Sequence, residues 1–350
     1  MPNISVCIIA KNEEKRIERL LKSLLPYNFE IVVVDTGSTD CTLEVVSQYT
    51  SSVYSYEWCN DFSKARNFSL QQAKNDWILM MDSDEWISSL DTEELAYFMR
   101  NLPDSVGAIN RHNKIGTPDQ PKYSTDRTER FFNRKKYEYQ GMIHEQLTPR
   151  NGLPMDCLLL NSTIEHDGYC MTPQQRQEKG KRNLTMLLAQ LEGEGPSPYL
   201  FYQLGKACEI LHDYPNELSY YEKALHYELD YSLAYVQSLF IAYLDTLLLL
   251  NKIPEAVTTL QTHPVLTDSA DYYYSAGRIY FAAKEYESAM DSFLNATKFS
   301  FANREGANTY LSYFELSKIL LLINEVDTAR SLLLKCGEYP PAIALLKQLS

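Results

Sequence analysis

The sequence has little of what a disulfide-stabilised, secreted or membrane-embedded protein would show. Its seven cysteines form no CxxC pair and have no regular spacing, so we expect reduced thiols rather than a disulfide framework or a zinc site. The longest apolar stretch, Leu239 to Leu250, is about half a membrane span and contains Asp245. No basic segment precedes the short N-terminal apolar run, which is typical of a strand and not of a signal peptide. These absences favour a cytoplasmic protein without an integral membrane segment.

An excess of positive charge is also missing. The formal net charge is −13 at pH 7, which argues against nucleic-acid binding through a broad basic face. If the protein binds phosphate, it must therefore do so locally. One dense basic segment exists, and its members are Arg127, Arg130, Arg134, Lys135 and Lys136. We expect Arg130, which precedes two phenylalanines, to point inward, whereas such segments are more often solvated faces.

Two common catalytic signatures are absent as well. The sequence contains no GxSxG and no P-loop pattern, so nothing indicates a covalent serine nucleophile or a P-loop nucleotide site. Nucleotidyl transfer on an α/β sheet would require a glycine-rich basic loop after the first strand. That segment is KNEEKR, residues 11–16, which has mixed charge and no glycine.

A change of hydrophobic periodicity near residue 170 divides the chain. Before it, short apolar runs that are typical of strands (ISVCIIA, EIVVVD and WILMMD) alternate with helical segments, and residues 17–24 place their apolar side chains on one helical face. This order predicts an α/β domain over residues 1–170, with a mostly parallel, Rossmann-like sheet covered by helices on both sides. Residues 171–197 are predicted to form a connecting helix and a linker.

Residues 198–350 show no strand signal and repeat themselves. Segments beginning at residues 198, 269 and 308 carry small or apolar residues at matching offsets, which resemble ~34-residue tetratricopeptide repeats. A degenerate copy lies around residues 232–263. Glu217 is an exception, because it occupies a position that is usually small. We expect three or four stacked helix pairs, and the alternative is an unrelated helical bundle.

Polar residues follow each predicted strand of the first domain, at residues 10–14, 35–40 and 82–85. In an open parallel sheet, ligands bind outside the carboxyl ends of the strands, so these clusters should share one edge. Because strand side chains alternate, Asp82 and Asp84 are expected to project the same way, and two adjacent carboxylates repel unless a cation joins them or one is protonated. Their oxygens suit Mg²⁺ or Mn²⁺ bridging to substrate phosphates, although a DxD pattern also occurs in surface turns.

Five motifs in this order resemble those of the family 2 glycosyltransferases with a GT-A fold. They are ISVCIIAKNEE, EIVVVDTGSTDCT, DFSKARNFSLQQAKNDWILMMDSDEW, RFFNRKKYEYQGMIHEQL and IEHDGY, and they extend over about residues 3–170. The combination with tetratricopeptide-like helices is similar to bacteriocin peptide S- and O-glycosyltransferases of the sublancin glycosyltransferase type. The later motifs also look like those of lipopolysaccharide-core glucosyltransferases.

The resemblance implies a UDP-sugar donor, UDP-glucose or UDP-N-acetylglucosamine, and it assigns residues to that donor. Asp35 looks like the carboxylate that contacts the uracil edge, with the backbone of Ala10 beside it, although Asp35 could instead cap the following helix. Asn12 and Glu13 are expected near the ribose. The remaining donor-side residues are Arg66, for which a surface ion pair is the alternative, Asp82 and Ser83.

The resemblance also implies a metal site and a general base. The metal ligands are expected to be Asp84, Asp82 and His166, and the alternative for His166 is a hydrogen-bonded histidine at the domain junction. Glu145 is expected to take the acceptor proton, with Asp167 and His144 as rivals. Glu85 is expected to be peripheral.

These assignments predict an inverting, metal-dependent transfer of a hexose to a Ser, Thr or Cys side chain of a peptide or protein. Inversion is implied by the resemblance alone. One alternative is transfer to a saccharide or glycolipid of the cell envelope, and another is a non-catalytic tetratricopeptide scaffold with a vestigial transferase domain. Repeat arrays present surfaces suited to peptides and to self-association, so a homodimer through the helical repeats is a further expectation.

Overall fold

The three apolar runs of the N-terminal half form strands at the predicted positions. They are β1 (Ile4–Ala10), β2 (Glu30–Asp35) and β4 (Trp77–Asp82) in the computed structural model, which describes residues 3–117, 120–263 and 269–349. β1 pairs in parallel with both β2 and β4. Alternate side chains of each strand enter cores on opposite faces of the sheet, as strand geometry requires.

Among the described residues, the main sheet has eight strands in the order β3-β2-β1-β4-β7-β6-β10-β5. The further strands are β3 (Val53–Ser55), β5 (Glu85–Ser89), β6 (Val106–Thr117), β7 (Gln120–Asn133) and β10 (Cys157–Cys170). The first four strands in this order are parallel, whereas β7 and β5 run antiparallel to their neighbours. The predicted α/β GT-A class is confirmed, and its sheet becomes mixed beyond β4.

Helices cover both faces of this sheet. The helices α1 (Ile17–Leu24), α2 (Thr42–Val46) and α4 (Thr92–Asn101) contribute to the core on one face. The helix α3 (Phe62–Gln72) and the hairpin of β8 (Tyr137–Gln140) and β9 (Gln146–Pro149) contribute to the core on the other. A 3₁₀ turn, Leu25–Tyr27, follows α1. The predicted apolar face of α1 is confirmed, because Ile17, Leu20, Leu21 and Leu24 are all buried.

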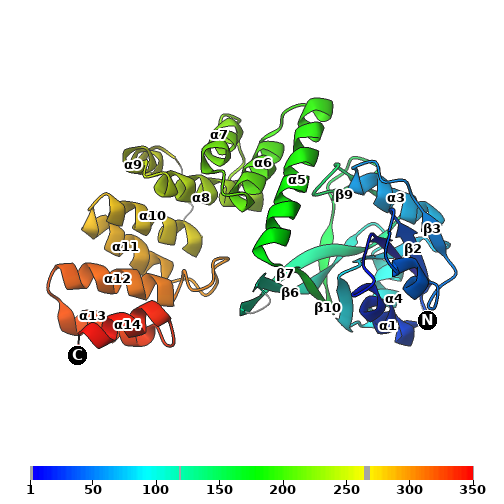
Figure 1. Ribbon diagram of the computed structural model, residues 1–350, viewed down its shortest axis with the longest axis horizontal. Coiled ribbons are helices and arrows are strands. Elements are labelled where there is room, and N and C mark those ends of the chain that lie inside the picture. The colour runs from blue at the N-terminus through cyan, green and yellow to red at the C-terminus, as the bar shows by residue number, and fades with distance from the viewer. Residues whose placement is uncertain (1–2, 118–119, 264–268, 350) are drawn as a thin grey trace. The chain divides into compact units, whose positions relative to one another are not determined.

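The long helix α5 (Pro173–Glu194) follows β10 (Figure 1). Thr172 and Gln175 form a capping box at its start, in which Thr172 Oγ1 accepts from the backbone N–H of Gln175. The chain then divides into two units, Met1–Gly195 and Pro196–Ser350. The division falls where Gly195, with φ of 84°, follows the last turn of α5.

The second unit is built of consecutive helix pairs, which are coloured from green to red in Figure 1. The pairs are α6 (Pro198–Ile210) with α7 (Tyr214–Leu225), α8 (Ala234–Leu249) with α9 (Ile253–Thr262), α10 (Ala270–Ala282) with α11 (Tyr286–Ala296), and α12 (Tyr310–Leu322) with α13 (Val326–Lys335), followed by α14 (Pro340–Gln348). A Cβ at Gly205 would lie 2.1 Å from the ring of Tyr221, and one at Gly277 would lie 2.7 Å from the ring of Phe293. Glycine thus lets the two helices of these pairs approach closely.

The apolar stretch Leu239–Leu250 lies mainly in α8. It is a core helix as predicted, since Leu239, Phe240 and Leu244 are fully buried. No helix in the described part of the chain is long and apolar enough to cross a membrane.

Candidate active site

The carboxyl ends of three adjacent strands bring the predicted polar segments together. Ala10, at the end of β1, pairs with Asp35 of β2, and Ile9 pairs with Asp82 of β4. Because parallel strands end at the same edge of a sheet, the loops that follow β1, β2 and β4 are neighbours. The shared edge expected from the sequence is therefore present.

Hydrogen bonds fasten the loop after β1 to the loop after β2. The backbone N–H of Asn12 donates to Ser38 Oγ at 2.9 Å, and the N–H of Thr39 donates to Asn12 Oδ1 at 2.8 Å. The N–H of Glu13 donates to Thr42 Oγ1 at 2.7 Å. Asn12 has φ of 57°, a left-handed conformation that asparagine tolerates better than most residues. Asn12 thus shapes the loop, and its contact with a ribose stays a prediction.

Asp35 is buried and stabilises the turn that follows β2. Its Oδ2 accepts hydrogen bonds from the backbone N–H of Gly37 at 3.0 Å and of Ser38 at 3.1 Å. This is the local capping role that the sequence offers as the alternative to a uracil contact. An ionised carboxylate has about four lone-pair positions. These bonds therefore leave room for a further donor, and the uracil contact stays a prediction.

A cavity of about 340 Å³ lies at this edge of the sheet. The predicted donor-side residues that line it are Ala10, Glu13, Arg66, Asp82 and Ser83. Sequence reasoning missed two aromatic lining residues, Trp58 and Phe62, whose rings lie 4.8 Å apart with an interplanar angle of 67°. Their position just before the SKARN segment was the available signal. Aromatic faces next to cationic side chains suit a nucleoside diphosphate.

Two lining residues of this cavity, Arg66 and Asp82, belong to a network of buried arginines and carboxylates. Arg66 Nε donates to Glu145 Oε1 at 2.5 Å, and Arg66 Nη2 donates to Asp82 Oδ1 at 2.6 Å. Arg130 Nη2 donates to Asp82 Oδ2 at 2.6 Å and to Glu85 Oε1 at 2.5 Å. Burial by itself would raise the pKa of Asp82, but the charges of Arg130 and Arg66 hold it well below its usual range.

This network corrects one expectation and agrees with another. Glu85 was expected to be peripheral, yet its side chain is 0% exposed and pairs with Arg130. The strand pairing of β5 with β10 turns Glu85 inward, which the sequence pattern did not reveal. Arg130 points inward as expected. Three other basic residues of its segment pair elsewhere: Arg134 and Lys135 with Asp76, and Lys136 with Asp104.

Asp82 and Asp84 were expected on one strand, but β4 ends at Asp82 and the two aspartates have different partners. Both oxygens of Asp82 are paired with arginines, whereas Asp84 Oδ2 lies 3.5 Å from His166 Nε2. Asp84 and His166 therefore come together as predicted from the resemblance. Ligation of a metal by Asp82 stays a prediction, and it would require one of these arginines to move.

The space between Asp84 and His166 fits a divalent cation. In the described part of the chain, no group of three or more His, Cys, Asp or Glu side chains is arranged to hold a metal. A Cβ at Gly168 would lie 1.9 Å from Asp84 Oδ2 and 2.6 Å from His166 Nε2, so glycine keeps this space open. His166 Nδ1 lies 2.8 Å from Asn113 Oδ1, and a proton on Nδ1 would leave the Nε2 lone pair facing the carboxylate. Mg²⁺ commonly takes one or two protein ligands and completes its shell with phosphate oxygens and water.

Glu13 lies in a negatively charged environment beside this pair. Burial raises the pKa of Glu13 to about 7, Arg16 opposes that rise, and the charges of Asp84 and Asp167 add to it. Asp167 itself accepts from Arg19 Nη2 at 2.5 Å. An acidic cluster with a raised carboxyl pKa is the electrostatic setting in which a bound cation is favoured.

Helix α5 contributes two cations that sequence reasoning did not select. Arg182 lines the cavity, and its Cζ lies 5.8 Å from the centroid of the Phe62 ring. Lys179, one turn earlier on the helix, is half-buried. Burial lowers the pKa of Lys179, and the carboxylates of Asp84 and Asp82 oppose that effect. Their spacing of three residues on one helix face was the only sequence signal.

The three candidates for the general base occupy different environments. Glu145 is nearly buried against Arg66, and Asp167 pairs with Arg19. His144 has φ of 54°, and burial lowers its pKa although the charge of Glu145 opposes this. A second cavity of about 320 Å³ is lined by both Arg66 and Glu145, together with Tyr139. Among the three candidates, Glu145 alone lines a cavity that shares Arg66 with the first one.

Comparison with known proteins gives a match to one protein family and several partial relatives. Residues 5–172 match the family described as Glycosyl transferase family 2. The SPbeta prophage-derived glycosyltransferase SunS of Bacillus subtilis is 27% identical over 232 residues, which cover 64% of this chain and 54% of that protein. A TPR repeat-containing protein of Synechococcus elongatus is 36% identical over 85 residues, or 24% of this chain and 21% of that protein. The chain spans about half the length of SunS.

Solved structures of S. aureus TarS and of MamA show a partial likeness to this chain. The 1–349 fragment of S. aureus TarS has a TM-score of 0.35 at 15% identity, covering 85% of this chain and 91% of that chain. The 41-end fragment of MamA from Desulfovibrio magneticus RS-1 has a TM-score of 0.39 at 17% identity, covering 50% of this chain and 95% of that chain.

Proposed function

Because residues 5–172 belong to glycosyl transferase family 2, we propose that the protein transfers a hexose from a UDP-sugar to a Ser, Thr or Cys side chain of a peptide or protein. The observation that carries the proposal is the position of Arg66, which lines both of the cavities described above and bonds to Asp82 on one side and to Glu145 on the other. In this proposal the first cavity holds the donor, and the second admits the acceptor.

The donor cavity and the residues around it offer complementary groups for the nucleoside diphosphate part of a UDP-sugar. Trp58 or Phe62 offers a ring face to the uracil, and base stacking on an aromatic side chain is worth about 1–3 kcal/mol. Asp35 contacts the uracil edge, and the loop with Asn12 and Glu13 contacts the ribose. Arg182 and Lys179 approach from α5 and offset the charge of the diphosphate.

The transfer is a single displacement. The acceptor oxygen or sulfur attacks the anomeric carbon from the face opposite the diphosphate, and a new C–O or C–S bond forms. The bond between the anomeric carbon and the diphosphate oxygen breaks, and its electron pair leaves with the diphosphate. Glu145 takes the acceptor proton, and the cations around the first cavity stabilise the leaving group. Attack from the opposite face inverts the configuration.

Asp84 and His166 would hold a divalent ion, Mg²⁺ or Mn²⁺, which when bound supplies Lewis-acid stabilisation of the diphosphate. In the arrangement described here Asp82 holds Arg66 and Arg130 in position. A peptide or protein acceptor is favoured over a saccharide or glycolipid by the second unit, because helical repeats present surfaces suited to peptides.

The test combines donor and acceptor assays. Purified protein is incubated with UDP-glucose or UDP-N-acetylglucosamine, with Mn²⁺ or with EDTA, and UDP release is measured with and without Ser- and Cys-containing peptides. We expect Mn²⁺-dependent UDP release and a hexose mass shift on the peptide. Asp84→Asn should abolish both, whereas Asp104→Asn, whose side chain is 82% exposed, should not.

Three other outcomes would redirect the assignment. Sugar transfer to a saccharide or glycolipid but to no peptide would show that the acceptor is a saccharide or glycolipid and not a peptide or protein. Full activity in EDTA would show that the reaction does not depend on a metal ion. Absence of both UDP release and nucleotide binding, measured by thermal shift, would favour the non-catalytic scaffold.

A further inference from the structure

The repeat unit contains a buried carboxyl group that breaks its own sequence pattern. Glu217 is the fourth residue of α7, the second helix of the first pair. The fourth residue of the second helix in the other pairs is Ala256 in α9, Ala289 in α11 and Ala329 in α13, and all three are 0% exposed. Glu217 is equally hidden, at 2% exposed. A carboxyl group therefore stands where the repeat otherwise buries a methyl group.

A second polar residue breaks the pattern at the same place. Thr246 of α8 is fully buried, whereas the matching residues of the neighbouring first helices are Ala207 and Ile279. Thr246 Oγ1 lies 2.6 Å from Glu217 Oε1 and 2.7 Å from the carbonyl oxygen of Ala242. Glu217 Oε2 has no hydrogen-bond partner. An unsatisfied buried polar atom costs about 1–3 kcal/mol of stability, so Glu217 Oε2 is a candidate for contact with a ligand.

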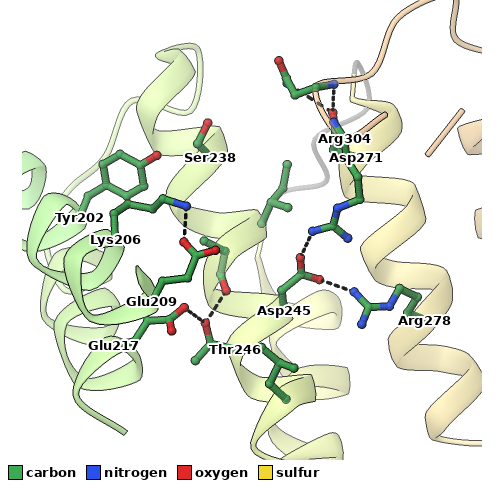
Figure 2. A pocket seen from close by; sticks show the side chains of 14 residues that line it. Tyr202, Lys206, Glu209, Glu217, Ser238, Asp245, Thr246, Asp271, Arg278 and Arg304 are labelled. Carbon is green, nitrogen blue, oxygen red and sulfur yellow. Dashed lines mark hydrogen bonds and ion pairs between the residues drawn. The ribbon is translucent and has the colours of Figure 1, made fainter. Parts of the chain in front are cut away.

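Glu217 lines a pocket of about 450 Å³ within the second unit, a volume typical of ligand sites (Figure 2). Helices α6, α8 and α10, which are the first helices of three successive pairs, supply most of its wall. Tyr202, Ile241 and Leu249 provide apolar surface, and Leu249 is 57% exposed. The pocket therefore combines an apolar wall with a buried carboxyl group.

The cations that line this pocket already have carboxylate partners. Lys206 pairs with Glu209, and Arg278 and Arg304 both pair with Asp245, as Figure 2 shows. Asp271, the remaining lining acid apart from Glu217, accepts hydrogen bonds from the backbone N–H groups of Asn303 and Arg304. Among the described lining residues, Glu217 and Asp271 are thus the carboxyl groups without an ion-pair partner, and of these two only Glu217 has a buried oxygen without a hydrogen-bond partner.

We propose that this pocket binds the side-chain ammonium group of a lysine in a peptide, with Glu217 as its counter-ion. One carboxylate oxygen remains for the ligand because the other bonds to Thr246. A point-charge ammonium needs only one such oxygen, whereas a guanidinium binds best to both. The burial of Glu217 favours a charge on a slender aliphatic stem over an α-amino group attached directly to the backbone, and the apolar wall suits that stem.

The electrostatics around Glu217 agree with this assignment. The Thr246 hydroxyl has one proton for two acceptors, and the Ala242 carbonyl can only accept, so a neutral Glu217 would supply the second proton. Burial raises the pKa of Glu217 to about 7; Thr246 and Lys206 lower it, whereas Glu209 and Asp245 raise it further. A bound ammonium would favour the ionised carboxylate, and binding near neutral pH should release a fraction of a proton.

The proposal is independent of the transferase reaction, and its test requires no turnover. The full chain is titrated with Ac-Gly-Lys-Gly-NH₂, in which lysine carries the sole amine, and binding is followed by saturation-transfer NMR. We expect saturation of the lysine methylene protons and none for the Nε-acetyl-lysine peptide. The arginine peptide and Gly-Gly-Gly-NH₂ with a free N-terminus should bind at least about tenfold more weakly, a difference of ~1.4 kcal/mol.

The variant Glu217→Ala restores the residue found in the other pairs and should therefore fold. We expect an unchanged or higher Tm together with loss of lysine-peptide binding, while Glu228→Gln, an exposed change outside the pocket, should bind as the wild type does. The proposal is overturned if the wild type gives no saturation transfer, if acetylation of the lysine has no effect, if the free N-terminus binds better than lysine, or if Glu217→Ala retains binding.

Discussion

Arg66 and Glu145 are 79 residues apart in the chain, and their side chains form a hydrogen-bonded ion pair of 2.5 Å. The pair joins helix α3 to the segment between β8 and β9. Only 8% of the Arg66 side chain and 11% of the Glu145 side chain is exposed, so water screens the pair little. Because Arg66 also bonds to Asp82, it couples the proposed donor cavity to the proposed acceptor cavity.

The first prediction concerns the stability that this pair provides. We expect Arg66→Met to lower the free energy of unfolding by about 3–5 kcal/mol, because it leaves the Glu145 carboxylate buried without its cation. The double variant Arg66→Met/Glu145→Gln should recover part of the loss, since the uncompensated charge is then gone. Urea unfolding measures both. The exposed Arg100→Met should change stability by less than about 0.5 kcal/mol, and an equally small effect of Arg66→Met would contradict the structure.

The second prediction concerns the space beside Asp84 and His166. Gly168→Ala places a methyl group 1.9 Å from Asp84 Oδ2 and must displace one or both side chains. We expect Mn²⁺ to bind about tenfold more weakly or worse in the presence of UDP, measured by titration calorimetry. Gly193→Ala is the matched control, because its added methyl group meets open space in a helix and should stabilise the protein by about 0.5–1 kcal/mol. Unchanged Mn²⁺ affinity in Gly168→Ala would remove this pair as the metal site.

The third prediction separates the diphosphate from the nucleoside. Arg182→Met and Lys179→Met should each weaken UDP binding about tenfold, the effect of losing one hydrogen bond to a charged group, and should leave uridine binding unchanged. Lys181→Met, an exposed cation on the same helix, is the control. If the two variants reduced uridine and UDP affinity equally, α5 would contact the base or ribose instead.

The fourth prediction follows from the carboxyl group of Glu13, whose pKa burial raises from 4.5 to about 7. The folded protein then binds more protons at this group than the unfolded chain, so its contribution to stability is full below about pH 4.5 and is lost as the pH rises to about 7. Glu13→Gln cannot ionise and should avoid this loss. We expect its Tm relative to the wild type to be higher at about pH 8 than at about pH 5, with EDTA present throughout.

Glu57→Gln, an exposed carboxyl substitution, provides the comparison for that series. A Tm difference between Glu13→Gln and the wild type that is the same at both pH values would show that Glu13 titrates normally in the folded protein.

Local patterns were sufficient for much of the fold. The runs ISVCIIA, EIVVVD and WILMMD are β1, β2 and β4 without a shift at either end, because alternating burial on two covered faces selects apolar residues along the whole strand. The combination of a family 2 glycosyltransferase domain with tetratricopeptide-like helices is likewise confirmed. Small residues at fixed offsets, such as Gly277 against Phe293, record the close approach of paired helices.

The sequence by itself therefore determined β1, β2 and β4, the helical second unit and the edge of the sheet at which polar loops gather, since each depends on residues that are near one another in the chain. Only the tertiary structure decided the partners at that edge: that Asp82 pairs with Arg66 and Arg130, that Glu85 is buried, and that α5 brings Lys179 toward the acidic residues. The tertiary structure also decided that Glu217 lines a pocket and has no ion-pair partner there. Such pairings join residues far apart in sequence, and their energies depend on the geometry and burial that packing creates, which no local pattern of residues encodes.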